Sequence, residues 1–140
     1  MVSAPTLSTR VDEWIWANAR LNVPSVNNNV YPEDNAPING PYVQFSMLSG
    51  MEVMGMNGTR VMLDSLYIIQ AIAETGDFKV IEPISDQIYN AFHRRFNQPT
   101  ANATILSSVC EEEIRRALST EAGTRYRYLG FRVRIQAVSN

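Results

Sequence analysis

The chain has 140 residues, of which 45% are hydrophobic and 19% are charged, and its mean hydropathy is −0.17. A chain of this size buries roughly two thirds of its unfolded surface, so we expect residues 1–140 to form a single folded domain that needs no disulfide, metal or cofactor. The net charge of −2 and the pI near 5.4 exclude a general electrostatic attraction to nucleic acid.

The chain contains one cysteine, Cys110, which excludes an internal disulfide. No apolar run approaches the length of a membrane span, and residues 1–12 lack the pattern of a secretory signal. These features predict a protein that is made in a reducing cytoplasm and has no membrane partner.

Apolar side chains first recur at helical spacing over residues 7–21, which predicts an amphipathic helix. Thr9 and Asp12 have the spacing of a capping box, and Pro24 ends the helix. One stripe of this helix carries Leu7, Val11, Trp14 and either Asn18 or Leu21.

Trp16 is the first candidate contact residue. On a helical wheel it lies about 200° from Trp14, away from the predicted stripe. Two explanations remain open for how its indole is covered. Either the segment after Pro24 folds back over the indole, or a neighbouring molecule contacts it.

A proline-rich segment follows the first helix. Pro32, Pro37 and Pro41 cannot donate backbone hydrogen bonds, and each biases the residue before it towards extended geometry. Residues 24–41 therefore predict a long extended arm, in which Tyr31 is a candidate interface residue. Such an arm becomes ordered by lying on its own sheet or on a neighbouring subunit, and the sequence leaves both open.

Residues 42–53 and 59–73 predict two strands joined by a turn at Asn57-Gly58, a pair suited to the positive φ angles of a type I′ turn. Both faces of the second strand are apolar, so it lies in the middle of the sheet or beneath a second subunit. Pliable methionines crowd this hairpin and either contact partners or fill an irregular core. The candidate contact residues among them are Met47, Met51, Met54 and Met56.

Helical spacing returns over residues 80–96, where Pro83 is tolerated in the first turn. Arg94 and Arg95 complement the helix dipole in the last turn, and His93 is expected to face solvent. The apolar positions of this helix are Ile81, Ile84, Ile88, Phe92 and Phe96.

Residues 104–118 and 126–138 predict two long strands joined by residues 119–124. Side chains of the second strand alternate, as is typical of a sheet that is covered on one side only. Its apolar face carries Leu129, Phe131, Val133, Ile135 and Ala137. Its polar face carries Tyr126, Tyr128, Arg132, Arg134 and Gln136, of which the two tyrosines are candidate contact residues.

The acidic run at 111–113 is expected to form ion pairs across this hairpin. The expected partners are Arg115, Arg116, Arg125 and Arg127. Taken together, the elements predict an α+β fold, with an antiparallel or mixed β-sheet, helices packed on one face, an extended arm and long β-hairpins.

The residues needed for catalysis do not form a recognisable set. A histidine-based triad would rest on His93 alone, and no serine lies in a nucleophile motif. The glycines at 50, 55 and 58 lack the Lys-Ser/Thr of a phosphate loop, and zinc-ligand spacing is absent. We therefore expect no enzyme activity and no catalytic, cofactor-binding or metal-binding residues.

Several short motifs follow one another along the chain. They are the first helix, Val30-Tyr-Pro, Ala36-Pro37, Pro41-Tyr-Val-Gln-Phe, the Gly58-Thr-Arg-Val strand, the helix from Ile84 to Phe92, and the arginine-rich terminal hairpin. This order resembles the tail-terminator, or tail-completion, proteins of long-tailed bacteriophages, over nearly the whole chain. The methionine-rich hairpin and the two-sided strand at 59–73 depart from the family's pattern.

The resemblance implies an α+β subunit of a six-membered ring at the head-proximal end of the tail tube. Such a ring stops tube growth and joins the tail to the head, so the implied partners are further copies of the chain, the tail tube protein and head–tail connector proteins. The implied location is the tail and neck of the virion, after assembly in the host cytoplasm.

Genomic DNA would pass through the lumen of this ring without being read, and Arg132 and Arg134 would either line the lumen or serve subunit contacts. Two alternatives remain. One is a head–tail connector or stopper ring, and the other is a small-molecule-binding α+β domain with a pocket under the methionine hairpin.

Overall fold

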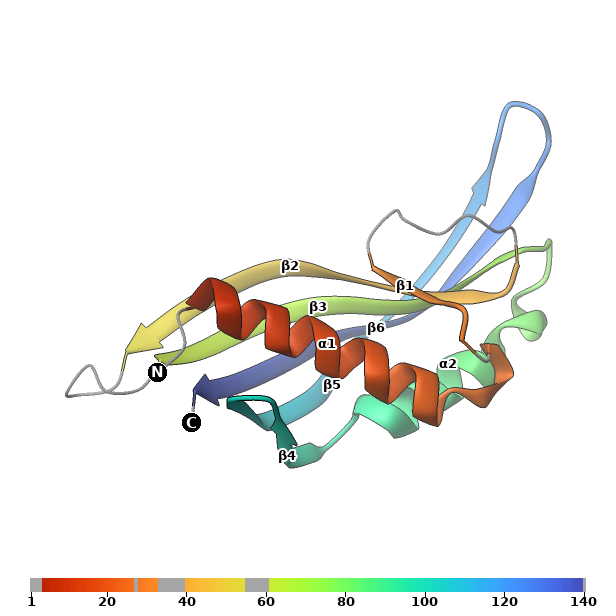
Figure 1. Cartoon of the computed structure of the whole chain (residues 1–140). Helices are drawn as coiled ribbons and strands as arrows, with labels where there is room; N and C mark the ends of the chain where they lie inside the picture. The colour runs from red at the N-terminus through yellow and green to blue at the C-terminus, as the bar shows by residue number, and fades with distance from the viewer. Residues whose placement is uncertain (1–3, 27, 33–39, 55–60, 140) are drawn as a thin grey trace.

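The computed structural model describes residues 4–26, 28–32, 40–54 and 61–139. The chain adopts an α+β fold, in which one six-stranded mixed sheet carries two helices on one of its faces (Figure 1). The elements in chain order are α1 (Ala4–Asn22), η1 (Pro24–Val26), β1 (Val30–Pro32), β2 (Tyr42–Met54), β3 (Val61–Glu74), η2 (Phe78–Val80), α2 (Glu82–Phe92), β4 (Arg95–Thr100), β5 (Ala103–Ser119) and β6 (Arg125–Ser139).

The sheet has the strand order β1-β2-β3-β6-β5-β4. The four long strands in its middle run antiparallel to one another, β4 is antiparallel to β5 at one edge, and β1 runs parallel to β2 at the other edge. The hairpin of β5 and β6 projects beyond the helices at one end of the molecule (Figure 1). The strands predicted at 42–53, 59–73, 104–118 and 126–138 are thus confirmed, and the strand at 61–74 lies in the middle of the sheet, as expected.

The core lies between the helices and one face of the sheet. The fully buried stripe of α1 consists of Leu7, Val11, Ile15 and Ala19. The helices touch through the rings of Trp14 and Phe92, whose centroids are 5.6 Å apart, and the side-chain amide of Asn18 donates to the carbonyl of Ala91 at 2.9 Å. The buried Tyr67 on β3 donates its hydroxyl hydrogen bond to Asp12 Oδ1 on α1 at 2.5 Å.

The first helix differs from its prediction in two ways. It begins at Ala4, so Thr9 and Asp12 lie inside the helix and do not form a capping box. Its buried stripe follows i, i+4 steps through Ile15 and Ala19, which leaves Leu21 78% exposed.

The proline-rich arm lies partly on the chain's own sheet. Val30–Pro32 forms β1, and the N–H of Val43 donates to the carbonyl of Asn29 at 2.9 Å. The ring of Tyr31 packs edge-on against that of Tyr42, with centroids 5.9 Å apart. Residues 33–39, in the middle of the predicted arm, lie outside the described part of the chain.

The second helix is shorter than predicted, since it spans Glu82–Phe92 and the chain then turns into β4. Arg94 has a φ of 55°, which ends the helical path. The Arg95 guanidinium donates to the carbonyls of Ala91 and Asn90 at 3.2 and 3.0 Å, so it satisfies the helix C-terminus from the next element. Phe96, predicted to be on the apolar face of the helix, is 53% exposed on β4.

The methionines of the β2–β3 hairpin are not equivalent. Met47 is half-buried and packs against the core, whereas Met51 is 65% exposed. The side chain of Met54, the whole of Met56 and the predicted Asn57-Gly58 turn lie outside the described part of the chain. Core filling therefore accounts for Met47, and Met51 stays a candidate contact residue.

None of the helices in the described ranges is both long and apolar enough to cross a membrane.

Gly130 allows β6 to lie against β3. A Cβ atom at this position would come within 2.2 Å of the Ile69 carbonyl oxygen and 2.4 Å of Gln70 Cα, both backbone atoms in the middle of the sheet. We expect Gly130→Ala to lower the free energy of unfolding by about 1–3 kcal/mol, because the strands must shift apart. Chemical denaturation measures this, with Gly40→Ala as the control, since a Cβ there meets only the Glu74 nitrogen at 3.9 Å. Equal effects of the two changes would contradict the close approach.

Candidate interaction surfaces

The face of the sheet that lies opposite the helices carries no helix in the described part of the chain, and we call it the open face. Along β3 the fully buried positions face the helices, and the alternate positions face the other way and are mostly half-buried. On β2, Met51 and Val53 belong to this open face, opposite Asp64 and Met62 of β3, and are 65% and 44% exposed. The β3 side chains of the open face are Met62, Asp64, Leu66, Ile68, Gln70 and Ile72.

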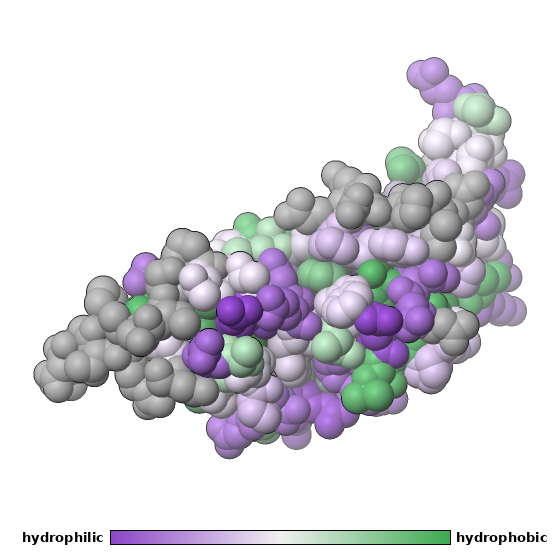
Figure 2. All heavy atoms as spheres, in the orientation of Figure 1, coloured by the Kyte–Doolittle hydropathy of each residue, from purple (hydrophilic) through white to green (hydrophobic). Residues whose placement is uncertain are grey.

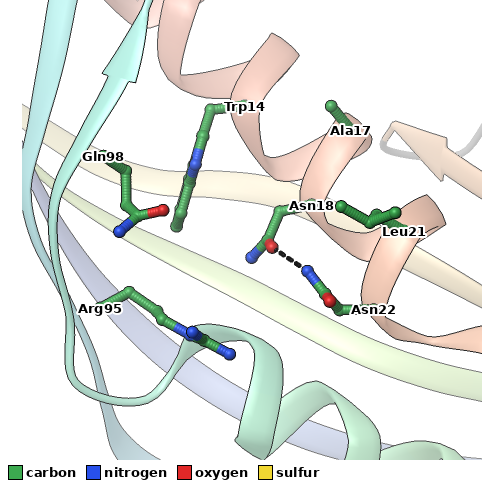
Figure 3. Close-up of a pocket in the computed structure, with 7 residues that line it drawn as sticks. All are labelled: Trp14, Ala17, Asn18, Leu21, Asn22, Arg95 and Gln98. Atoms are coloured by element: carbon green, nitrogen blue, oxygen red, sulfur yellow. Dashed lines mark hydrogen bonds between the residues drawn. The ribbon is translucent and has the colours of Figure 1, made fainter.

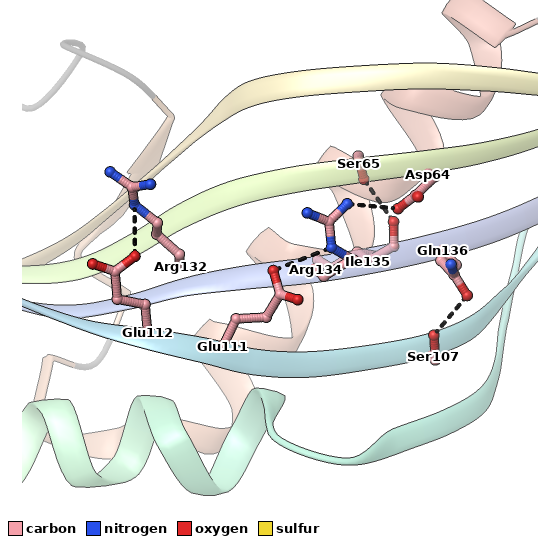
Figure 4. Close-up of polar contacts among 9 residues, drawn as sticks. All are labelled: Asp64, Ser65, Ser107, Glu111, Glu112, Arg132, Arg134, Ile135 and Gln136. Atoms are coloured by element: carbon pink, nitrogen blue, oxygen red, sulfur yellow. Dashed lines mark hydrogen bonds and ion pairs between the residues drawn. The ribbon is translucent and has the colours of Figure 1, made fainter.

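A charged cluster lies in the middle of the open face (Figure 4). The Arg134 guanidinium donates to Asp64 at 3.1 Å and to Glu111 at 3.1 Å, so one side chain joins β3, β6 and β5. These two hydrogen bonds raise the pKa of Arg134. Arg132 pairs with Glu112 at 3.6 Å.

The predicted ion-pair partners of the acidic run are therefore wrong. The register places Glu112 opposite Arg132, and a bulge between Cys110 and Glu112 turns Glu111 towards Arg134. The predicted arginines engage other groups. Arg115 lies 4.0 Å from the ring centroid of Phe78. Arg127 lies beside the same ring and donates to the carbonyl of Gly76. Arg116 and Arg125 lie towards the tip of the hairpin.

The two predicted tyrosine contact residues lie on β6 near the tip of the hairpin. The Arg116 guanidinium stacks 4.3 Å from the ring centroid of Tyr128, and both Tyr126 and Tyr128 are half-buried. The structure places Tyr128 and Arg134 on one face of β6 but at different levels along the strand, so the predicted site residues form a band and not one compact site.

Trp16 lies on a different surface, at the edge of the sheet where α1 approaches β1. Its side chain is 42% exposed, and the Arg20 guanidinium lies 4.1 Å from its ring centroid. A pocket of about 340 Å³ opens beside it, lined by Trp16, Asp12, Glu13, Pro32 and Phe45. The arm approaches Trp16 at Pro32 but leaves the indole partly exposed, so Trp16 stays a candidate contact residue.

Two further pockets are small. One, of about 260 Å³, lies between α1 and β4, where Trp14 and Asn18 face Arg95 and Gln98 (Figure 3). The other, of about 240 Å³, lies on the open face beside Asp64. The surface on the helix side of the molecule is a mixture of hydrophilic and hydrophobic side chains (Figure 2). Volumes of this size lie at or below the lower end of the range for sites that bind small molecules.

His93 and Cys110 form a structural contact. The backbone N–H of Cys110 donates to His93 Nδ1 at 3.2 Å, and the His93 ring stacks on Tyr89 with centroids 4.5 Å apart. The prediction that His93 faces solvent is therefore wrong, since its ring is half-buried. Burial raises the pKa of the Cys110 thiol to about 12, so the thiolate needed for nucleophilic chemistry is scarce near neutral pH.

Within the described ranges, no group of three or more His, Cys, Asp or Glu side chains is placed to hold a metal ion. The clustered carboxylates Asp64 and Glu111 are instead both bound to Arg134.

Comparison with known proteins gives a fold but no sequence family. No family model matches the chain, and no curated protein matches it in sequence. Among solved structures, a chain of the "Virion of native gene transfer agent (GTA) particle" is similar, with a TM-score of 0.63 and 14% sequence identity. The match covers 93% of this chain and 97% of that chain. At this identity the likeness shows a shared fold that extends over almost the full length of both chains.

The raised pKa of Cys110 predicts a slow reaction with thiol reagents. The shift from 9.0 to about 12 makes the thiolate about 1000-fold scarcer at pH 8 than in the unfolded chain. We expect native protein to label far more slowly than protein in guanidinium chloride, and more slowly than an added Leu21→Cys thiol on the exposed side of α1. Rapid labelling of native Cys110 would contradict the raised pKa of its thiol.

Proposed function

We propose that this chain is a structural virion protein that forms a ring at the head-proximal end of a bacteriophage tail tube. There it terminates tail assembly and offers the surface to which the head is joined. Its partners are further copies of the chain, the tail tube protein and the connector proteins of the head.

The observation that carries this proposal is the fold shared with a virion chain over 93% of one chain and 97% of the other. The match covers nearly all of both chains, so little of either chain lies outside the shared fold. The order of motifs along the sequence independently resembles the tail-terminator family, which supports the more specific role within a virion.

The described surfaces suit a ring subunit. A head-to-tail ring needs two different complementary surfaces on each subunit. The open face with Met51 and the α1 surface with Trp16 are two different surfaces available for contacts, and both expose large apolar side chains.

The charges on the open face suit a lumen through which DNA passes without being held. Arg132 and Arg134 are each paired with carboxylates, so they offer phosphate groups little free positive charge. In this proposal both arginines organise the sheet surface, whether that surface faces the lumen or a neighbouring subunit.

A stopper ring of the head–tail connector would share these surfaces, so assembly on a tail tube is the experiment that distinguishes the two roles. Purified protein is added to growing tail tubes and to completed heads, and tube length and binding are followed by electron microscopy. A terminator caps one end of each tube and stops its growth. Binding to heads with no effect on tubes would favour the stopper ring and overturn the terminator role.

Mass measurement tests the ring. With a chain mass of 15.8 kDa, light scattering is expected to show a species near six times that mass, about 95 kDa, in solution or on tube ends. A 15.8 kDa monomer at every concentration, with or without tubes, would contradict a ring.

Substitutions at the two apolar surfaces are expected to weaken assembly more than folding. Trp16→Ala and Met51→Glu remove or charge side chains that are 42% and 65% exposed in the isolated chain, so each should change the melting temperature little and reduce the fraction assembled at least tenfold. Leu21→Ala, at a position that is 78% exposed and lies on neither surface, is the control. Loss of thermal stability with unchanged assembly would place Trp16 or Met51 in the core of the subunit.

A further inference from the structure

The sheet has two unpaired edge segments in the described part of the chain. On one edge, β4 pairs with β5 only as far as Ser108, so no described strand borders β5 from Val109 to Ser119. On the other edge, β1 pairs with β2 only from Val43 to Phe45, so no described strand borders β2 from there to Met54. Unpaired edges of this length readily accept a further strand.

The two segments lie at opposite ends of the sheet. The free part of β5 is in the projecting hairpin, whereas the free part of β2 leads to the far end of the sheet (Figure 1). β4 occupies the other half of the β5 edge, and β1 occupies the other half of the β2 edge. A second copy can therefore place the free part of its β2 beside the free part of β5 without displacing either short strand. The neighbouring copies are then staggered along the strands, as adjoining strands of closed sheets are.

Strand direction also permits this contact. The long strands β2, β3, β6 and β5 alternate in direction, so β5 is antiparallel to β2. Two copies in the same orientation, related head to tail, therefore bring β5 of one against β2 of the next as an antiparallel pair. This arrangement needs no reversal of one copy.

The side chains favour one register. In a continuous sheet, open-face residues of one copy must stay on the open face of the next. Ile114 and Val53 lie on that face, opposite Gly130 and Met62, whereas Arg115 and Glu52 lie on the helix side, opposite the buried Leu129 and Leu63. Placing Ile114 opposite Val53 also places Arg115 opposite Glu52, which pairs opposite charges.

One of the two neighbouring registers with the same faces is unfavourable. A shift of two residues places Glu113 opposite Glu52, and like charges directly opposite each other destabilise a strand pair. The acidic run on β5 thus destabilises one competing alignment. Glu52 is the single charged residue of the β2 segment 49–54, so the favoured alignment places no like charges opposite each other.

We propose that copies of this chain join through their sheet edges, with residues 113–118 of β5 pairing antiparallel to residues 49–54 of β2 of the next copy. Backbone hydrogen bonds supply much of the contact, and the apolar strip of one open face continues into the next. The contact is heterologous, so repetition gives a ring or a filament. Its closure into a ring rests on the proposed function, whereas the edge pairing does not.

Directed disulfide formation tests the pairing. Val53→Cys and Ile114→Cys are made separately in the full chain, mixed, and oxidised with glutathione, because directly opposed residues of an antiparallel pair have Cβ atoms about 4.5–5.5 Å apart. We expect a covalent dimer of the two variants to form at least tenfold faster than dimers in either variant alone. The double variant is expected to give a ladder of linked chains that ends at the closed ring.

Leu21→Cys mixed with Val53→Cys is the matched control, and wild-type protein reports any contribution from Cys110. Cross-linking of Ile114→Cys with Val53→Cys no faster than in the control would overturn the proposal. Fastest cross-linking of Ile114→Cys with itself would also overturn it, because like edges would then pair about a two-fold axis.

A charge exchange tests the register. Arg115→Glu and Glu52→Arg should each weaken association about two- to fivefold, and the double variant should recover most of the loss. Additive losses in the double variant would overturn this alignment. Tube capping is measured separately, so edge pairing without capping would refute the terminator role alone, and capping without the cross-link would refute the edge contact alone.

Discussion

One-sided coverage of the sheet is the constraint on which the remaining structure depends. Four long antiparallel strands form a broad sheet, and the two helices are enough to cover only one of its faces. The helix-facing side chains, such as Tyr67 and Ile135, are fully buried, while the opposite side chains form a surface of mixed apolar and charged character. Since a sheet can keep one face in water, this chain folds with an extended surface still available for other molecules.

The sequence predicted the parts of this fold that periodicity controls. Alternation along residues 126–138 identified the two faces of β6, and apolar positions on both faces of residues 59–73 placed β3 in the middle of the sheet. The short strand β4 was missed because its helical apolar spacing continues to Phe96, while the positive φ angles at Arg94 and Asn97 that redirect the chain leave only a weak composition signal.

The interaction surfaces were predictable only in part, because they depend on register. The exposure of Trp16 followed from helical geometry within α1 alone. The partners of Glu111 and Glu112 depend on a bulge in β5 and on the alignment of β5 with β6, which no local pattern encodes. The contact between His93 and Cys110 joins a helix end to a strand edge and likewise arises from tertiary structure.

The Arg134 cluster has a consequence for any molecule that covers the open face. Removing a lone charge from water is costly, and a partner surface must normally supply a counter-ion to compensate. Here the subunit supplies both signs itself, since Asp64 and Glu111 already bind the guanidinium. The guanidinium can therefore be covered at a lower dehydration cost than if it were alone, and its hydrogen bonds would strengthen once water is excluded, while the second carboxylate leaves one negative charge for a covering molecule to compensate.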